Sequence, residues 1–364
     1  MPITASLPMT WTATMVSASH WVGLTLPGMM EEPGSFSGMK ISPSPHRGPE
    51  ASQRTSLAIF MRFAARAFKA PWEKVRASLA VSAWNLLGAV RKGRPVSSAA
   101  ASAAASPNPA GAFSPVPTAV LSAHTGGLGD PVIRDLTDYI EPALRHYKSL
   151  GIDFEAVYTG FLGSGKQVDC CLEFFKEYPG ALKIVDPVMG DNGKPYRTCT
   201  QELRRRMKEL AAAADIITPN ITEAAMLLDE AYPAAPLTRS EAKSMLLRLS
   251  QMGPKRVVVT GTELAEGGLS AVGYDGENSS FWYVPCEYIP VNYPGCGDIY
   301  ASVLIGAELS GASLPIAMAR AGDFAELCVK TTYSYGSDPR YGVMLESVLG
   351  KLIKNEIVGD FRAL

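Results

Sequence analysis

From residue 113 onward, short apolar runs alternate with amphipathic stretches, and this alternation constrains the fold more than any other feature of the chain. The predicted strands are residues 118–121, 156–159, 182–185, 216–218 and 256–260. The predicted helices are residues 131–150, 166–178, 200–214, 222–229 and 240–252. Such alternation is typical of a mostly parallel sheet with helices on both faces. We therefore predict an α/β, doubly wound domain over residues 113–364.

The first 112 residues differ in composition from the rest of the chain. They contain no aspartate and only four glutamates, against eleven lysines and arginines. Residues 1–56 lack periodicity and residues 97–117 are rich in Ser, Ala and Pro, which is typical of disorder. Residues 57–90 are basic and could form a packed helix, a surface-binding helix or a segment without a role. We predict that residues 1–112 are an atypical extension, largely disordered or non-homologous to the domain.

Charge and cysteine content narrow the expected partners and location. The formal net charge is −1, which gives no sign of nucleic acid or an anionic membrane as a partner. No apolar run in the extension reaches the length of a membrane span, and no ordered signal peptide is recognisable. The six cysteines form no CxxC pair. We expect a cytoplasmic protein with reduced thiols that binds a small molecule.

The segment PGCGD at residues 294–298 is a glycine turn that opens onto an apolar helical stretch. In such a turn the backbone N–H groups of Gly295, Cys296 and Gly297 can converge on an anion at the positive end of a helix. The carboxylate of Asp298 can take a proton from an attacking hydroxyl. The arrangement suits phosphoryl transfer to an alcohol, although an ordinary helix start explains the same residues equally well.

Further polar residues follow the predicted strands, where open α/β sheets bind their ligands. Asp186 and Asp191 bracket a turn after residues 182–185 and could hold Mg²⁺ through water or form an Asx turn. Asn220 and Glu223 stand three residues apart at a helix start, which also fits a capping box. Thr260 ends the strand at 256–260 with a hydroxyl suited to phosphate.

A second glycine-rich segment, residues 160–167, nearly matches the phosphate loop GxxxxGK[ST]. Its last position is Gln167, which has no hydroxyl for the Mg²⁺ that such loops coordinate. The missing hydroxyl argues against a P-loop kinase, and we expect Lys166 to face solvent.

Taken together and in this order, the motifs resemble those of the ribokinase-like superfamily, in particular the pyridoxal/pyridoxamine kinases and their neighbours, the hydroxymethylpyrimidine kinases. The matching segments are residues 117–126, 159–163, 186–191, 218–223 and 295–298. The resemblance implies a ribokinase-like fold over about two thirds of the chain, residues 113–352. The strand and helix that begin such proteins are not recognisable, so the first βα unit is missing or replaced by residues 84–113.

The resemblance also implies roles for individual residues. It assigns Asp298 as the catalytic base, Gly295, Cys296 and Gly297 as the anion hole, and Asn220, Glu223 and Thr260 as contacts to ATP and its phosphates. It assigns Asp186, Asp191 and Glu223 to the metal, and His124, Thr125 and Phe161 to the substrate. Phe161 stands where some pyridoxal kinases have Tyr, which leaves the preferred substrate open.

The implied function is ATP-dependent phosphorylation of the hydroxymethyl group of a vitamin B6 vitamer to its 5'-phosphate. ATP and Mg²⁺ are the implied cofactors, a monovalent cation is left open, and a cytoplasmic homodimer is the implied assembly. Two alternatives stay open at this point. One is a hydroxymethylpyrimidine (phosphate) kinase of thiamine biosynthesis, and the other is a catalytically impaired vitamer-binding homologue that lacks a normal first unit.

Overall fold

The computed structural model describes residues 86–91, 112–125, 128–353 and 360–364, all within one compact unit, Glu73–Leu364. Most of the predicted extension, residues 1–85 and 92–111, lies outside the described residues. For those residues the predicted disorder and the predicted basic helix stay predictions. The predictions were wrong for residues 86–90, expected at the end of the basic helix, and for residues 112–117, expected to be disordered, because these two segments pair with each other as strands.

The main sheet has nine strands in the order β13-β12-β11-β10-β9-β6-β5-β1-β2. The strands are β1 (Leu86–Arg91), β2 (Ala112–Pro117), β5 (Phe154–Thr159), β6 (Leu182–Val185), β9 (Ile216–Ile217), β10 (Arg256–Leu264), β11 (Gly268–Asp275), β12 (Ser280–Pro285) and β13 (Arg362–Ala363). Two small antiparallel pairs lie outside it, β3 (Ala119–Leu121) with β4 (Ile133–Asp135) and β7 (Gly190–Asp191) with β8 (Lys194–Pro195).

Strand direction confirms the predicted α/β class and shows that the sheet is mixed. The central strands β5, β6, β9 and β10 pair in parallel. The other pairs are antiparallel, so β2, β5, β6, β9, β10 and β12 run one way and β1, β11 and β13 run the other. Strands β10, β11 and β12 are joined by short turns, which allow only antiparallel pairing because parallel strands need a long crossover.

Strand β1 occupies the place between β5 and β2 and is antiparallel to both. In a doubly wound sheet this place would be filled by a parallel strand followed by a helix. The described residues from 86 to 125 contain strands only. This arrangement agrees with the prediction that a normal first βα unit is missing or replaced.

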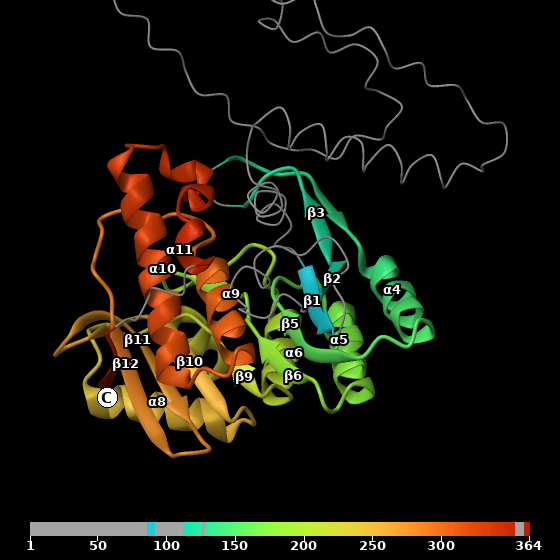
Figure 1. Ribbon diagram of the computed structural model, residues 1–364, viewed down its shortest axis with the longest axis horizontal. Helices are drawn as coiled ribbons and strands as arrows, with labels where there is room; N and C mark the ends of the chain where they lie inside the picture. The colour runs from blue at the N-terminus through green and yellow to red at the C-terminus, as the bar shows by residue number, and fades with distance from the viewer. Residues whose placement is uncertain (1–85, 92–111, 126–127, 354–359) are drawn as a thin grey trace, which may run out of the picture. The chain divides into compact units, whose positions relative to one another are not determined.

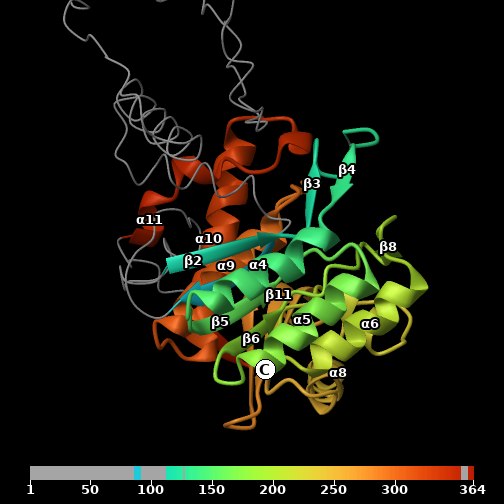
Figure 2. The same ribbon diagram turned by 90° about the vertical axis from the view of Figure 1, so that its right-hand side faces the viewer.

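Helices cover both faces of the sheet (Figures 1 and 2). One face carries α4 (Thr137–Ser149), α5 (Gly165–Glu177), α6 (Gln201–Ala212), α7 (Ile221–Leu227) and α8 (Arg239–Gln251), and the other carries α9 (Cys296–Leu309) and α10 (Leu314–Ser334). Short turns η2 (Pro339–Tyr341), η3 (Leu345–Ser347) and α11 (Gly350–Ile353) follow. In β10, Val257 and Val259 pack on the α4–α8 side whereas Val258 packs under α9 and α10, as strand alternation requires.

The predicted helices match α4 to α8 except at the first helix. Residues 131–136 do not begin it, because Ile133–Asp135 forms β4 and α4 starts at Thr137. The Asp135 carboxylate accepts a hydrogen bond from the Thr137 N–H at 2.7 Å, which fixes the start of the helix. The predicted strand 118–121 is β3, but it pairs with β4 and not with the main sheet. None of the described helices is both long and apolar enough to cross a membrane.

Candidate active site

Three acids predicted from separate motifs meet at the carboxyl ends of the parallel strands. Asp186 directly follows β6, Glu223 lies in the first turn of α7 after β9, and Asp298 lies in the first turn of α9. Asp186 and Glu223 are buried and Asp298 is partly buried. The charge of Asp186 acts on both other acids. The fold therefore gathers a compact group of carboxylates, called the acid cluster below.

Burial and mutual repulsion make every acid of the cluster hard to ionise. Burial raises the pKa of Asp186 to about 7, and the hydrogen bond from Tyr158 opposes this shift. Burial and then the charge of Asp186 raise the pKa of Asp298 to about 8. Burial and then Asp186 hold the pKa of Glu223 well above its ordinary value. Among the described residues these three acids form no salt bridge, so no described basic side chain balances their charge.

The start of α7 fastens the loop that carries Asp186 and Asp191. Asn220 and Glu223 form a reciprocal capping box, with N–H to oxygen distances of 2.9 Å in both directions. Glu223 Oε1 also accepts a hydrogen bond from the Met189 N–H at 3.0 Å, and Asn220 Nδ2 donates to the Gly190 carbonyl at 2.9 Å. The capping box that the spacing of Asn220 and Glu223 also allowed is therefore present. The same two side chains in addition hold the loop against the sheet.

Asp191 and Thr260 lie at the edges of this arrangement. Asp191 is partly exposed on the β7–β8 hairpin, and its Oδ1 accepts from the Asn192 N–H at 2.8 Å. Thr260 lies within β10, forms a parallel bridge with Asn220 and donates its N–H to the Pro219 carbonyl at 3.0 Å. Thr260 is therefore adjacent to the capping box, and its predicted contact with phosphate stays a prediction.

The turn before α9 leaves a helix N-terminus open. Gly295 is the N-cap residue, has a φ of +92° and offers no side-chain cap to the helix. The first N–H groups of a helix have no partner within the helix, so those of Cys296, Gly297 and Asp298 are available to an anion. A Cβ added to Gly295 or Gly297 would meet nothing within 4 Å, so there is open space beside the turn. Burial and then Asp298 raise the pKa of the Cys296 thiol to about 11, which keeps it neutral.

The predicted substrate residues lie on loops, and of the three His124 is held near the turn before α9. His124 Nε2 is 2.6 Å from the Arg340 carbonyl, and because a carbonyl only accepts, Nε2 carries the proton. Thr125 is exposed and Phe161 is partly exposed. A Cβ on Gly342 would lie 3.3 Å from the Pro294 carbonyl. The segment that holds His124 therefore also contacts the turn at residues 294–298, called the anion turn below. The described hydrogen bonds and ion pairs do not join His124, Thr125 or Phe161 to the acid cluster.

Comparison with known proteins identifies the family. The family model described as phosphomethylpyrimidine kinase matches residues 137–342, which is more than half of the chain. The chain belongs to the phosphomethylpyrimidine kinase family. This match includes every acid of the cluster and the whole anion turn.

Solved structures support both the family and its link to pyridoxal kinases. A structure from Bacteroides thetaiotaomicron, provisionally named a phosphomethylpyrimidine kinase, is 35% identical with a TM-score of 0.68 and covers 76% of this chain and 96% of that one. A second crystal form with the same name and source contains pyridoxal and is 37% identical, with a TM-score of 0.65 and coverages of 69% and 88%. Pyridoxal kinase from Lactobacillus plantarum is 29% identical with a TM-score of 0.60 and coverages of 66% and 85%. The predicted ribokinase-like fold is confirmed.

Curated relatives of this chain also include pyridoxal kinases and thiamine biosynthetic enzymes, but the match covers only part of their length. Pyridoxal kinase PdxY of Granulibacter bethesdensis is 28% identical over half of this chain and 66% of its own length. The thiamine biosynthetic bifunctional enzyme TH1 of Arabidopsis thaliana is 30% identical over 57% of this chain and 39% of its own length. The chain spans less than half the length of several such relatives.

The segment that nearly matches a phosphate loop, residues 160–167, connects several elements through hydrogen bonds. Ser164 caps α5 by accepting from the Gln167 N–H, and Gln167 itself is buried. Gln167 Nε2 donates to the Thr118 carbonyl and to Thr137 Oγ1, both at 2.9 Å. Lys166 is exposed, as predicted. Gln167, which stands where a phosphate loop has Ser or Thr, therefore has a structural role.

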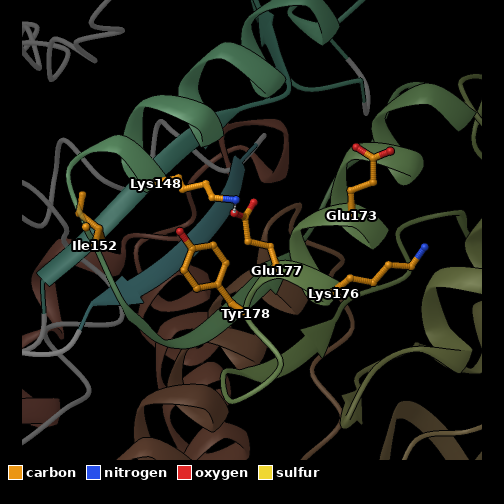
Figure 3. A pocket seen from close by; sticks show the side chains of 7 residues that line it. Lys148, Ile152, Glu173, Lys176, Glu177 and Tyr178 are labelled. Carbon is orange, nitrogen blue, oxygen red and sulfur yellow. Dashed lines mark ion pairs between the residues drawn. The ribbon is translucent and has the colours of Figure 1, made fainter.

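A hollow of about 730 Å³ lies at the opposite end of α5 from these motifs (Figure 3). Its lining residues are Lys148, Gly151, Ile152, Glu173, Lys176, Glu177 and Tyr178. Lys148 forms an ion pair with Glu177 across it. A helix of the length of α5 spans about 20 Å, so this hollow is remote from the acid cluster.

Two tyrosines that were not predicted as site residues lie near the acid cluster. The hydroxyl of Tyr158 donates to Asp186 Oδ2 at 3.1 Å. Tyr196 follows the β7–β8 hairpin and is close enough to Glu223, Asp191, Asp186 and Asp298 for their charges to raise its pKa, after burial. The position of Tyr158 near the carboxyl end of a predicted strand was a usable signal. No local pattern marks Tyr196, because its neighbours come from three separate elements.

The raised pKa values predict how stability depends on pH. Between about pH 4 and about pH 8, folded Asp186 and Asp298 hold protons that the unfolded chain has released, so rising pH favours unfolding. In chelator-treated protein, we expect the Tm advantage of Asp186→Asn over the parent to grow as the pH rises from about 4 to about 7 and to level off above that. Calorimetry of both proteins over this window measures the effect. A constant difference in Tm would contradict it.

Proposed function

We propose that this phosphomethylpyrimidine kinase family member transfers the γ-phosphoryl group of ATP to the hydroxymethyl group of a vitamin B6 vitamer. The observation that carries the proposal is the first turn of α9. There the Asp298 carboxylate stands beside unpaired backbone N–H groups and open space at the Gly295 turn. A base and an anion site on adjacent residues are what phosphoryl transfer to an alcohol needs.

The proposed reaction uses few protein groups. Ionised Asp298 accepts the proton of the substrate hydroxyl, and the substrate oxygen forms a bond to the γ-phosphorus. The bond between that phosphorus and the oxygen shared with the β-phosphate breaks, and ADP leaves with the electron pair. The N–H groups of Cys296, Gly297 and Asp298 stabilise the charge that spreads over the transferred phosphoryl oxygens.

Asp186 of the acid cluster and the nearby Asp191 fit the Mg²⁺ that accompanies ATP. Among the described residues no three His, Cys, Asp or Glu side chains are placed to hold a metal ion together. Mg²⁺ commonly takes only one or two carboxylates and keeps several waters, and Asp186 and Asp191 can supply them. The second oxygen of the predicted ligand Glu223 is already used by the capping box, so Glu223 fits better as a support for the loop. Bound Mg²⁺ would neutralise charge on the phosphates.

The vitamin B6 acceptor is supported by the relatives named pyridoxal kinase and by the Bacteroides structure with pyridoxal. A hydroxymethylpyrimidine kinase is the second candidate, favoured by the family model and by the bifunctional thiamine enzyme. A vitamer-binding homologue with impaired catalysis is the third, favoured by the antiparallel β1 in place of a βα unit. The cytoplasmic homodimer and the division at residues 112 and 113 remain proposals from the resemblance and the composition.

The test is a phosphorylation assay on the purified full chain. Pyridoxal, pyridoxamine, pyridoxine and hydroxymethylpyrimidine are each incubated with ATP and Mg²⁺, and ADP and the phosphorylated product are measured together. We expect a B6 vitamer to yield equal amounts of its 5'-phosphate and ADP. Phosphorylation of the pyrimidine alone would favour the second candidate. Vitamer binding by calorimetry without any product would favour the third.

A further inference from the structure

Tyr158 reaches the acid cluster from the opposite face of the sheet to α4–α8. It is the penultimate residue of β5 and packs against the small apolar cluster formed by Ala156, Ile184, Ile216 and Ile305. Ile305 belongs to α9, so the ring lies on the face that α9 covers. From there its hydroxyl donates to Asp186 Oδ2 at 3.1 Å. The tyrosine thus links β5 to the cluster below α9.

Glycine at position 160 provides the space that the hydroxyl occupies. A Cβ on Gly160 would lie 3.3 Å from Tyr158 Oη and 3.5 Å from Cε1 of the ring. The backbone next to it also contributes, because the Asp186 N–H donates to the Thr159 carbonyl at 2.9 Å. The position of Asp186 is therefore set by contacts of three consecutive residues, Tyr158, Thr159 and Gly160.

The carboxylate of Asp186 has no other described protein partner. Its Oδ2 accepts from Tyr158, while no described hydrogen bond or ion pair reaches its Oδ1. Without the hydrogen bond from Tyr158, repulsion from Glu223 and Asp298 would push the Asp186 side chain away when all three acids are ionised. A single neutral donor that fixes one oxygen leaves the other oxygen free for a ligand.

We propose that Tyr158 is a positioning residue that holds the Asp186 carboxylate in one orientation, with Oδ1 available to the divalent cation that accompanies the nucleotide. The inference rests on the proposed kinase function, which it deepens. Supporting side chains that orient a metal-binding carboxylate typically change metal affinity or activity by about 10- to 100-fold when removed. Tyr158 touches neither the phosphoryl group nor the acceptor in this assignment.

The test is Tyr158→Phe, which removes only the hydroxyl. Mn²⁺ is titrated into the full chain with and without ADP, and free Mn²⁺ is followed by electron paramagnetic resonance. We expect Mn²⁺ binding about tenfold weaker than in the parent, and a Mg²⁺ concentration for half-maximal rate that rises by a similar factor. Excess Mg²⁺ should restore kcat, and the KM for the vitamer should not change. A merely structural defect would not be rescued in this way.

Tyr147→Phe is the matched control. It removes a tyrosine hydroxyl that donates to the Pro115 carbonyl at 3.1 Å, and Tyr147 packs with the core on the α4–α8 side. It should leave Mn²⁺ binding unchanged. If Tyr158→Phe binds Mn²⁺ as tightly as an active parent, the positioning role is overturned and the kinase function stands. If the parent lacks turnover but Tyr158→Phe still weakens Mn²⁺ binding, the positioning role stands and the kinase function fails.

Discussion

The Asp298→Asn variant is expected to lose about 10²- to 10⁴-fold in kcat, the range that a positioned general base contributes. Asparagine has nearly the same shape as aspartate but cannot take the proton of the substrate hydroxyl. The backbone N–H groups of the first turn of α9 are unaffected, so ATP and the acceptor should bind with KM values close to those of the parent. Initial rates at saturating ATP, with the preferred acceptor from the substrate panel, measure the effect.

A second acid near α9 provides the control for this experiment. Asp323 lies on α10 and is partly buried, and burial followed by the charge of Glu326 raises its pKa. It is not part of the acid cluster, so Asp323→Asn should keep the kcat of the parent. If Asp298→Asn also turned over at the rate of the parent, Asp298 would not be the base. The open turn at Gly295 would then act only as an anion site.

Much of the fold was predictable because its central strands are short, apolar and separated by helices. The strand predicted at residues 182–185 is β6, and the stretch at 256–260 begins β10. Strands β11 and β12 were not among the predicted strands; β11 buries four consecutive residues, so it lacks the regular alternation that marks a half-buried strand. The run 118–121 was placed in the main sheet because propensity cannot say which partner a strand pairs with. That choice depends on β4, which the sequence had suggested to be helical.

The site was predictable where motifs follow parallel strands, because the carboxyl ends of such strands share one edge. This reasoning pointed to Asp186 and Glu223, which follow β6 and β9, whereas Asp298 was predicted from the glycine turn before α9. It could not decide between a capping role and a metal role for Glu223, since the spacing from Asn220 fits both. Only the hydrogen bonds to Met189 and Asn220 show how fully its oxygens are used.

Gly190→Ala is expected to lower kcat/KM for ATP by about 100-fold, the loss that a displacement near 1 Å can cause at a site of this kind. A Cβ at position 190 would clash with the Lys194 carbonyl oxygen and would lie 2.9 Å from Met226 Cε and 3.0 Å from Pro195 Cα. Because Lys194 and Pro195 belong to the same hairpin, β7 and β8 must move apart, and Met226 of α7 must also give way. Steady-state kinetics with ATP as the varied substrate tests this.

The reason for so large an effect lies in the bonds that the backbone of Gly190 makes. Its carbonyl accepts from Asn220 Nδ2 at 2.9 Å, and its N–H supports the Glu223 carboxylate. A shifted hairpin breaks both and moves Asp191. Gly180→Ala is the matched control, because a Cβ there meets nothing within 4 Å and its φ is not in the left-handed region. Equal kinetics for the two variants would mean that the hairpin yields without disturbing the acid cluster, and that the contact between α7 and the loop does not position the nucleotide.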